Sequence, residues 1–212
     1  MKRELRELME SLACPTCNQR LKLVVEQENE QEIITGFMFC SKCIMQYPIA
    51  EYNSLVGWVP APLEAVEKML ELAQVGQEDA VYDLGCGDAR VLIMAVRRFN
   101  ARKAVGYEIR QDLIEGSQKE IRNQMLEDQV TVIRDNLLNA DLSEASVVTL
   151  YLSEGVNEIL KPKLETETRP ATRIVSLEYP IETWRPARIE ICSIGTCYLY
   201  RIPQAFQNSS CD

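Results

Sequence analysis

The sequence predicts an α/β protein, in which a mostly parallel sheet is covered by helices on both faces and preceded by a small separate module. From residue 80 onward, short apolar runs alternate with stretches of helical spacing, which is typical of parallel sheets with right-handed crossover connections. The first of these runs ends in a glycine-rich turn, Asp83-Leu-Gly-Cys-Gly87, of the kind that holds ligands in such sheets. The first 57 residues hold four cysteines in two close pairs, which favours a separate metal-binding module.

The composition of the 212-residue chain suits one medium-sized domain with a small addition, because 46% hydrophobic residues can form a sizeable core. The formal net charge is −9 and the lysines and arginines are not clustered, so we expect no nucleic-acid partner and no membrane association. No run of 18 apolar residues occurs and the N-terminus is highly charged, which predicts a cytoplasmic protein without a signal peptide. The chain has no histidine, which excludes mechanisms that need an imidazole.

Three segments are expected along the chain. Residues 1–57 form the cysteine-containing module, in which the strand-like runs LKLVV and IITGFMF flank the acidic EQENEQE. The two prolines of GWVPAP (57–62) favour extended backbone and mark the junction. Residues 58–203 form the α/β domain, and the tail 204–212 is expected to be disordered.

The α/β domain opens with a helix after Pro62, whose apolar stripe comprises Leu63, Val66, Met69, Leu70 and Ala73. Strands are predicted at 80–84, 103–109, 130–133, 146–152, 172–179, 188–192 and 196–202. Helices are predicted between them at 89–99, 111–125 and 154–164. The last two strands are joined by Ile194-Gly195 alone, so they form a hairpin that gives the sheet an antiparallel end, with Cys192 facing Cys197.

The glycine turn can be assigned a cofactor class from its charges. The third glycine of a dinucleotide-binding fingerprint is missing, since the motif reads Gly85-Cys-Gly87-Asp-Ala-Arg90. Two carboxylates, Asp83 and Asp88, bracket the turn and would repel a pyrophosphate, which needs bare amide donors at a helix N-terminus. S-adenosylmethionine carries an ammonium and a sulfonium group and no phosphate, so the acidic turn favours it. The alternative is a tight turn without a ligand, and Cys86 is expected to be a packing residue rather than a nucleophile.

Polar residues at the ends of the second and third strands supply the rest of the expected cofactor site. Glu108 lies 21 residues after Gly87, where an acidic side chain can accept both hydroxyls of a ribose. Asp135 and Asn136 follow the third strand and are expected to bind the adenine amino group.

These motifs together resemble a known family. Residues 62–203 resemble class I S-adenosylmethionine-dependent methyltransferases, with DLGCGDAR as the cofactor turn and GYEI as the ribose-binding strand end. More narrowly, WVPAPLEAVEKML, YDLGCGDAR, VVTLYL and SLEYPIETW resemble archaeal and mitochondrial-type protein-lysine methyltransferases. The resemblance implies a Rossmann-like seven-stranded sheet in the order 3-2-1-4-5-7-6. It also implies cofactor contacts from Pro60, Pro62, Tyr82, Asp83, Gly85, Gly87, Glu108, Ile109, Asp135, Asn136 and Tyr151.

The resemblance implies methyl transfer to lysine amines, so the expected partner is a protein with an accessible lysine. Two alternatives stay open: a methyltransferase for a small-molecule acceptor, and a non-catalytic cofactor-binding scaffold that partners another protein. The sequence departs from the family at Ala89, where glycine is usual, and at Ala61, where threonine or serine is usual. We expect the first change to affect packing only, and the second to touch the mouth of the site.

The catalytic residues are expected at the ends of the fourth and fifth strands. Tyr151 is predicted to orient the acceptor, and Glu178, with its neighbour Tyr179, is the second candidate. Methyl transfer is an in-line displacement that needs alignment and the exclusion of water, and a lysine amine must arrive neutral. Each candidate has a structural alternative: Tyr151 as part of a buried strand and Glu178 as a strand edge.

The cysteine pairs have the spacing of a structural zinc site. Cys14, Cys17, Cys40 and Cys43 give C-x2-C-x22-C-x2-C, which brings four thiolates around one Zn²⁺ and leaves no open coordination position. The stretch from LACPTC through GFMFCSKCIMQYPIAE resembles the small zinc-binding activator subunit of several methyltransferases. This zinc-ribbon module is expected to cover part of the catalytic mouth or present the substrate, or else only to stabilise the domain to which it is fused.

Overall fold

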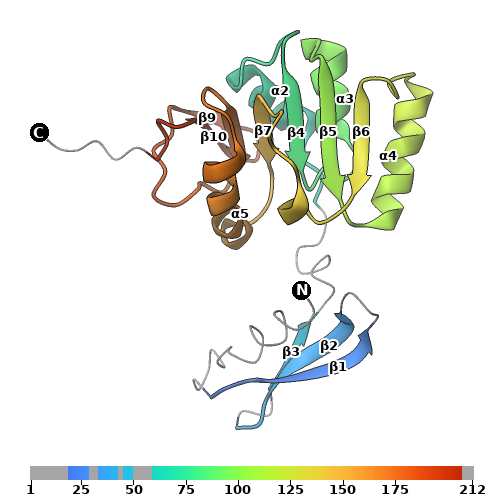
Figure 1. Cartoon of the computed structure of the whole chain (residues 1–212), viewed down its shortest axis with the longest axis vertical. Helices are drawn as coiled ribbons and strands as arrows, with labels where there is room; N and C mark the ends of the chain where they lie inside the picture. Colours follow the sequence, from blue (N-terminus) through green and yellow to red (C-terminus); the bar gives the residue numbers. More distant parts are fainter. Residues whose placement is uncertain (1–18, 29–32, 43–44, 50–58, 207–212) are drawn as a thin grey trace, which may run out of the picture. The chain divides into compact units, whose positions relative to one another are not determined.

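The computed structural model in Figure 1 describes residues 19–28, 33–42, 45–49 and 59–206. The chain divides into two compact units, Met1–Trp58 and Val59–Asp212, and each unit has its own sheet. Within the described ranges, no helix combines the length and the apolar character needed to cross a membrane.

The first unit contains a three-stranded antiparallel sheet. Its strands are β1 (Lys22–Glu28), β2 (Ile33–Cys40) and β3 (Met45–Ile49), hydrogen-bonded in the order β1-β2-β3. Cys40 ends β2 and is buried, whereas Cys14, Cys17 and Cys43 lie outside the described residues. The described residues alone hold no group of three or more potential metal ligands.

The second unit is built on a seven-stranded, mostly parallel sheet. Its strands are β4 (Ala80–Leu84), β5 (Lys103–Glu108), β6 (Val130–Arg134), β7 (Val147–Leu150), β8 (Arg173–Leu177), β9 (Arg188–Cys192) and β10 (Gly195–Arg201). They lie side by side in the order β6-β5-β4-β7-β8-β10-β9 (Figure 1). Numbered 1 to 7 within this sheet alone, that order reads 3-2-1-4-5-7-6. β4 to β8 are parallel, and β10 is antiparallel to both of its neighbours, which confirms the predicted antiparallel end.

Helices cover both faces of this sheet, as predicted. They are α2 (Leu63–Leu72), α3 (Arg90–Phe99), α4 (Gln111–Asn123) and α5 (Glu154–Glu167), with a short 3₁₀ helix, η1 (Leu137–Asn139), after β6. One buried cluster joins apolar residues of α2, α3 and α4 to the sheet, and the other joins α5 to the opposite face. Successive strand residues alternate between the two clusters, since Val81 belongs to the first and Tyr82 to the second.

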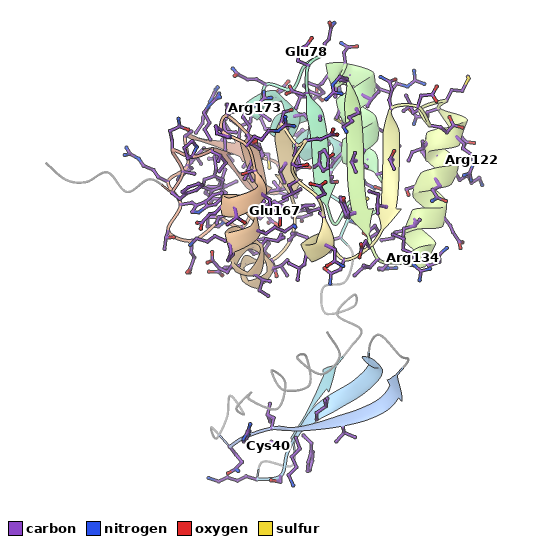
Figure 2. The ribbon with its side chains drawn as sticks, viewed as in Figure 1. Cys40, Glu78, Arg122, Arg134, Glu167 and Arg173 are labelled. Carbon is purple, nitrogen blue, oxygen red and sulfur yellow. The ribbon has the colours of Figure 1, made fainter. Side chains whose placement is uncertain are left out.

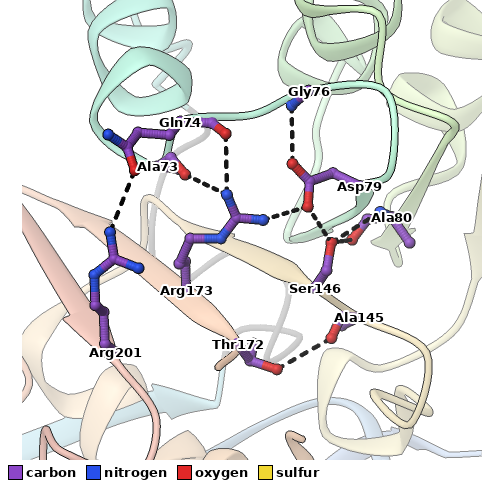
Figure 3. A network of polar contacts seen from close by, with 10 residues as sticks. All are labelled: Ala73, Gln74, Gly76, Asp79, Ala80, Ala145, Ser146, Thr172, Arg173 and Arg201. Carbon is purple, nitrogen blue, oxygen red and sulfur yellow. Dashed lines mark hydrogen bonds and ion pairs between the residues drawn. The ribbon is translucent and has the colours of Figure 1, made fainter. Parts of the chain in front are cut away.

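A network of polar contacts fixes the edge of the sheet where the parallel strands begin (Figure 3). The Arg173 guanidinium donates to the carbonyl oxygens of Ala73 (2.7 Å) and Gln74 (3.0 Å) at the end of α2, and it forms an ion pair with Asp79. The Ser146 hydroxyl donates to the same Asp79 carboxylate at 2.7 Å. These contacts tie the starts of β4, β7 and β8 together, so the opposite ends of these strands are also held in register.

Figure 2 shows the two edges of the sheet by their labelled side chains. Glu78 and Arg173 lie at the edge where β4 and β8 begin, and Arg134 lies at the opposite edge, where β6 ends. The glycine turn and the predicted site residues of the strand ends lie at this carboxyl-end edge.

Two local expectations of the sequence are wrong. Leu63 is 59% exposed, because α2 begins at this residue and turns only the later stripe positions inward. Residues 204–206 belong to the folded unit rather than to a disordered tail, since Ala205 is buried and the Phe206 ring lies 5.6 Å from that of Trp184. Residues 207–212 lie outside the described residues.

The hairpin between β9 and β10 also differs by one residue from the prediction. Gly195 is the first residue of β10 and pairs with Cys192, so the loop consists of Ser193 and Ile194. Cys197 therefore pairs with Glu190 across the hairpin and is not directly opposite Cys192, although the Cys192 thiol is near enough to help raise the pKa of Cys197.

Candidate cofactor and acceptor site

The glycine turn follows β4 and is held against β5 by backbone hydrogen bonds. The amides of Gly85 and Cys86 both donate to the carbonyl oxygen of Tyr107, at 2.9 and 3.1 Å. Gly85 and Gly87 have φ values of 85° and 54°, in the left-handed region that glycine adopts without strain. The turn therefore needs glycine at both positions, and it exposes backbone at the carboxyl-end edge.

Ala89 lies in the same left-handed region, with φ 64° and ψ 16°, directly before α3. A Cβ atom is unfavourable there by about 1 kcal/mol. The expectation that alanine at this position affects packing only is therefore wrong, because the difference from glycine is one of backbone conformation.

Asp83, near the end of β4, is a buried carboxylate. Burial is the main cause that raises its pKa to about 7, the hydrogen bond from the Thr149 hydroxyl opposes this, and the nearby Glu108 and Asp88 carboxylates raise it further. The Thr149 hydroxyl donates at 2.7 Å from the neighbouring strand β7, where it lies opposite Asp83. Near neutral pH, the charged and the neutral form of the Asp83 side chain are therefore both populated.

Glu108 ends β5 and joins the turn to the next strand. Its carboxylate accepts hydrogen bonds from the amides of Gly87 (2.9 Å), Ile109 (2.8 Å) and Arg110 (2.9 Å). Its backbone carbonyl accepts from the amide of Asp135 at 3.2 Å. The structure thus brings Gly87, Glu108 and Asp135 together, as the positions of the strand ends predicted.

Asp88 does not act as a free negative charge beside the turn. Burial tends to raise its pKa, but the hydrogen bonds and charge of Arg90 outweigh this, so the pKa is lowered overall. The Arg90 guanidinium lies 2.5 Å from Asp88 and also donates to the carbonyl oxygen of Ala61 at 2.7 Å. The prediction that two carboxylate charges bracket the turn is therefore corrected: Asp88 is paired and Asp83 is only partly ionised.

The Arg90 contact places the proline segment next to the turn. Pro62 is half-buried and precedes α2, whereas Pro60 is exposed. Both flank Ala61, whose carbonyl oxygen is bound by Arg90. Trp58, which comes before this segment, lies outside the described residues.

The residues after β6 are shaped by their own hydrogen bonds. Asn136 caps η1, since its side-chain oxygen accepts from the amide of Leu138 at 2.9 Å. The Asp135 carboxylate accepts from the amide of Asn136 (2.7 Å) and the side chain of Asn139 (2.8 Å). Asp135, Asn136 and Ile109 are all half-buried at the carboxyl-end edge.

Tyr82 points away from this group. Its ring belongs to the buried cluster on the α5 face, and the Lys103 ammonium, at the start of β5, lies 5.9 Å from the ring centroid. Burial raises the pKa of the Tyr82 hydroxyl, and Lys103 opposes this. Tyr82 is thus a core residue in this structure, on the opposite face of β4 from its neighbour Asp83.

Tyr151 and Glu178, from the ends of two neighbouring strands, meet at the same edge. Burial and then the hydrogen bond to the Glu178 carboxylate raise the pKa of Tyr151 to about 12. Tyr151 packs against the buried cluster of α2 and α3, as do Cys192 and Ile194 of the hairpin. The two predicted catalytic residues therefore form one pair.

Two residues that support the site were missed by the sequence reasoning. Thr149 lies opposite Asp83 on β7, and Gly106 lies behind the turn, where an added Cβ would be 2.4 Å from the Cys86 sulfur. The thiol of Cys86 is buried, and burial raises its pKa well above its usual range, in keeping with a packing residue. The alternation of β7 could have identified Thr149, because it is the only polar residue in SVVTLYL apart from Ser146 and Tyr151.

Several known proteins resemble this chain. A family model for the ANTKMT methyltransferase domain matches residues 83–188. The chain is 44% identical over 155 residues to a protein-lysine N-methyltransferase of Saccharolobus islandicus (strain REY15A), a match that covers 71% of this chain and 96% of the relative. It is 29% identical over 134 residues to the adenine nucleotide translocase lysine N-methyltransferase of Mus musculus, which covers 63% of this chain and 58% of that protein.

A solved structure resembles this chain in both sequence and fold. It is the crystal structure of an RNA methyltransferase from Salinibacter ruber in complex with S-adenosyl-L-homocysteine, with 38% sequence identity and a TM-score of 0.68. The match covers 73% of this chain and 100% of that chain.

Proposed function

We propose, from the premise that the chain belongs to the ANTKMT methyltransferase domain family, that it transfers methyl groups from S-adenosylmethionine to lysine side chains of proteins. The observation that carries the acceptor class is the 44% identity along 96% of the protein-lysine N-methyltransferase of Saccharolobus islandicus. The name of the Mus musculus relative points to the same acceptor.

The residues of the carboxyl-end edge suit this cofactor. Gly85 and Gly87, both at positive φ, place no side chain at these two positions of the turn, and Asp83 and Glu108 provide carboxylate acceptors beside it. When bound, S-adenosylmethionine supplies a methyl group on a positively charged sulfur. We propose that Glu108 accepts the ribose hydroxyls, that Asp83 stabilises the positive charge of the methionine end, and that Pro60, Pro62, Gly85, Gly87, Ile109, Asp135, Asn136 and Tyr151 complete the contacts.

The proposed acceptor site is the pair of Tyr151 and Glu178. With a pKa of about 12, Tyr151 is a neutral phenol whose O–H can donate a hydrogen bond to the Glu178 carboxylate, while its oxygen lone pairs can accept one from an amine N–H. The Glu178 carboxylate attracts the incoming lysine ammonium. The amine must lose a proton to solvent before it can attack, because only the neutral amine has a lone pair. The pair then orients that lone pair toward the methyl group.

The test is methyl transfer to proteins of a cell extract with labelled S-adenosylmethionine, followed by mass spectrometry of the labelled residues. We expect label on lysine, and we expect Tyr151→Phe and Glu178→Gln each to lower kcat by about 10- to 100-fold without weakening cofactor binding. Tyr198→Phe, which deletes a tyrosine hydroxyl on a different strand, β10, is the matched control and should leave kcat unchanged. Label confined to small molecules, or cofactor binding without any transfer, would contradict the proposal.

RNA is a second candidate acceptor because the Salinibacter ruber match covers all of that RNA methyltransferase chain. Phosphate binding needs unpaired cations, and three arginines near the turn and helices are already paired: Arg90 with Asp88, Arg98 with Glu67 and Arg110 with Asp112. The net charge of −9 also opposes RNA binding. In the same extract assay, label that is lost on ribonuclease treatment and kept after proteolysis would establish RNA as the acceptor.

We propose separately that Cys14, Cys17, Cys40 and Cys43 bind one structural Zn²⁺. The C-x2-C spacing supports this, as does the place of Cys40 directly before the connection from β2 to β3. Metal analysis of the purified chain should give about one zinc ion per chain, since four thiolates complete one tetrahedral site. Cys14→Ser and Cys40→Ser should lose the zinc, and Cys192→Ser should keep it. Zinc retained by the first two variants would contradict the proposed ligand set.

A further inference from the structure

The backbone directly after β8 makes a strained turn at Glu178. The amide of Tyr179 donates to the carbonyl oxygen of Leu177 at 2.9 Å, and Glu178 between them has φ 65°. A γ-turn with its central residue at positive φ is the strained form of this turn. A non-glycine residue in such a conformation persists only where the surrounding structure holds it there, and such residues cluster at functional sites.

Two buried side chains form hydrogen bonds that fix the backbone of this turn. The Asn157 amide nitrogen, in the first turns of α5, donates to the carbonyl oxygen of Tyr179 at 3.0 Å and to the Ser176 hydroxyl oxygen at 3.2 Å. The Ser176 hydroxyl in turn donates to the same Tyr179 carbonyl oxygen at 2.5 Å. Asn157 and Ser176 are both fully buried. The Tyr179 carbonyl is thus fixed by two donors, one from α5 and one from β8.

Asn157 is not a residue that stability alone favours at this position. Its side-chain oxygen is buried without a hydrogen-bond partner, and it is the one such side-chain atom found among the described residues. An unpaired buried acceptor destabilises the folded state, whereas an apolar side chain of the same shape would not. The amide nitrogen of Asn157, by contrast, makes both contacts with the turn.

The turn also directs the Glu178 side chain. The Glu178 amide donates to the carbonyl oxygen of Thr196 at 2.8 Å, which fixes its backbone on β10. A Cβ at Gly195 would lie 2.7 Å from Cγ of Glu178, so the side chain passes over this glycine. Its carboxylate lies near enough to the Tyr151 hydroxyl to raise the pKa of that group.

We propose that Asn157 is a positioning residue, which holds the strained turn so that the Glu178 carboxylate stays on the Tyr151 hydroxyl. The inference rests on the proposed acceptor site. Loss of the amide donor frees the turn to relax, Glu178 leaves Tyr151, and the phenolic oxygen loses its fixed orientation toward the acceptor. Asn157 touches neither acceptor nor cofactor in this arrangement and acts only through Glu178.

The test combines kinetics with a direct measurement on Tyr151. Asn157→Leu keeps the side-chain shape and removes both the donor and the unpaired oxygen. We expect kcat to fall about tenfold, with the KM and Kd for S-adenosylmethionine within twofold of the unchanged chain and no loss of thermal stability. In a Glu178→Gln background the same substitution should change kcat by less than about twofold, because the residue through which Asn157 acts is already altered. Asn123→Leu, on the exposed surface of α4, is the matched control and should change nothing.

The second measurement does not depend on activity. In the chain with ¹³C-labelled tyrosine, the resonance of Tyr151 titrates with its pKa, which should fall in Asn157→Leu because the Glu178 carboxylate has moved away. An unchanged Tyr151 titration, or an equal loss of kcat in both backgrounds, would overturn the inference. If wild-type protein labels no lysine but the Tyr151 titration still shifts, the proposed function fails and the positioning role stands. Should Asn157→Leu fail to fold, Ser176→Ala removes the other donor to Tyr179 and should shift the same titration in the same direction.

Discussion

The ionisation of Asp83 should make cofactor binding depend on pH. Its carboxylate is buried and its pKa is raised to about 7. Among the residues that the structure describes, the one side-chain hydrogen bond to it comes from Thr149. S-adenosylmethionine carries positive charge, so it should bind the ionised form of Asp83 and shift the equilibrium toward it. Affinity should therefore rise as the pH increases through 7.

The size of the effect follows from the ionised fraction. With a pKa of about 7, roughly half of the free protein has Asp83 ionised at pH 7 and about 3% has it ionised at pH 5.5. If only the ionised form binds, the apparent Kd is the intrinsic Kd divided by that fraction, so it should be about 16-fold weaker at pH 5.5 than at pH 7. Above pH 8 the curve should level, at about twofold tighter than at pH 7.

Isothermal titration calorimetry with S-adenosylmethionine from pH 5.5 to 8.5 measures this directly. Repeating the titration at pH 7 in buffers of different ionisation enthalpy should show about half a proton released per cofactor bound. Asp83→Asn should remove the slope between pH 5.5 and 7 and bind weakly throughout. Thr149→Val removes the hydrogen bond that lowers the Asp83 pKa, so it should move the transition to higher pH. A wild-type Kd that stays within twofold from pH 5.5 to 7 would refute the reasoning.

The stability of the cofactor-free protein should follow the opposite trend. The folded-state pKa of Asp83 lies above the ordinary value of 3.8, so the folded state binds the proton more tightly than the unfolded state does. Its contribution is fully present below about pH 4 and is lost as the pH rises toward 7. Asp83→Asn should therefore unfold at higher urea concentration than wild type at pH 8, although it binds the cofactor less well.

Three further substitutions test the fold around the site. Ala89→Gly should stabilise the protein by about 1 kcal/mol in urea unfolding, with unchanged cofactor affinity, because φ 64° suits glycine; a loss of stability would contradict the assigned conformation. Gly106→Ala forces a Cβ to within 2.4 Å of the Cys86 sulfur and should cost about 1–3 kcal/mol and weaken cofactor binding, whereas Gly116→Ala, with no atom near its added Cβ, should be neutral or stabilising. Arg173→Met breaks the largely buried ion pair at the amino-end edge and should cost about 3 kcal/mol with the cofactor Kd within twofold; a large change in Kd would show that this edge reaches the site.

The sequence predicted the second unit well where the signal is local. Alternating apolar runs and helical stretches depend on residues that are close in sequence, and all seven strands and four helices form where they were predicted. The positions of Asp83, Glu108 and Tyr151 followed from one rule, that parallel strands end at the same edge of the sheet. The same rule put Glu178 at this edge, and its proximity to Tyr151, 27 positions earlier in the sequence, is a finding of the structure.

Errors arose where a side chain's partner or direction is set by distant residues. The contact of Arg90 with the Ala61 carbonyl oxygen depends on how the segment before α2 passes the turn, whereas the pairing of Arg90 with Asp88, two positions away, is local and could have been anticipated. The left-handed conformation of Ala89 has no signal in an alanine, because alanine is favoured in helices. The position of Tyr82 could have been predicted from the sequence. Adjacent residues of a strand point to opposite faces of the sheet, so if Asp83 points toward the turn, its neighbour Tyr82 points to the other face.

The two edges of the sheet carry opposite contributions to stability. At the amino-end edge, Arg173, Asp79 and Ser146 satisfy one another and the last carbonyls of α2. At the carboxyl-end edge, Asp83 is a buried acid and Glu178 is strained, and each destabilises the fold by its own conformation or burial. A domain of marginal stability keeps such residues only if other contacts offset them.

The same strand connects the two edges. β8 begins at Arg173, within the polar network, and the strained turn at Glu178 follows its end. Because the network fixes the start of β8, it also fixes where the strand ends and where Glu178 follows. The network therefore supports the site without contacting it. Substitutions in the network should therefore lower stability and leave the Kd for cofactor unchanged. Substitutions of Asp83 and Glu178 should instead lower cofactor binding or turnover, with little loss of stability or even a gain. This relation is expected when function requires locally unfavourable structure.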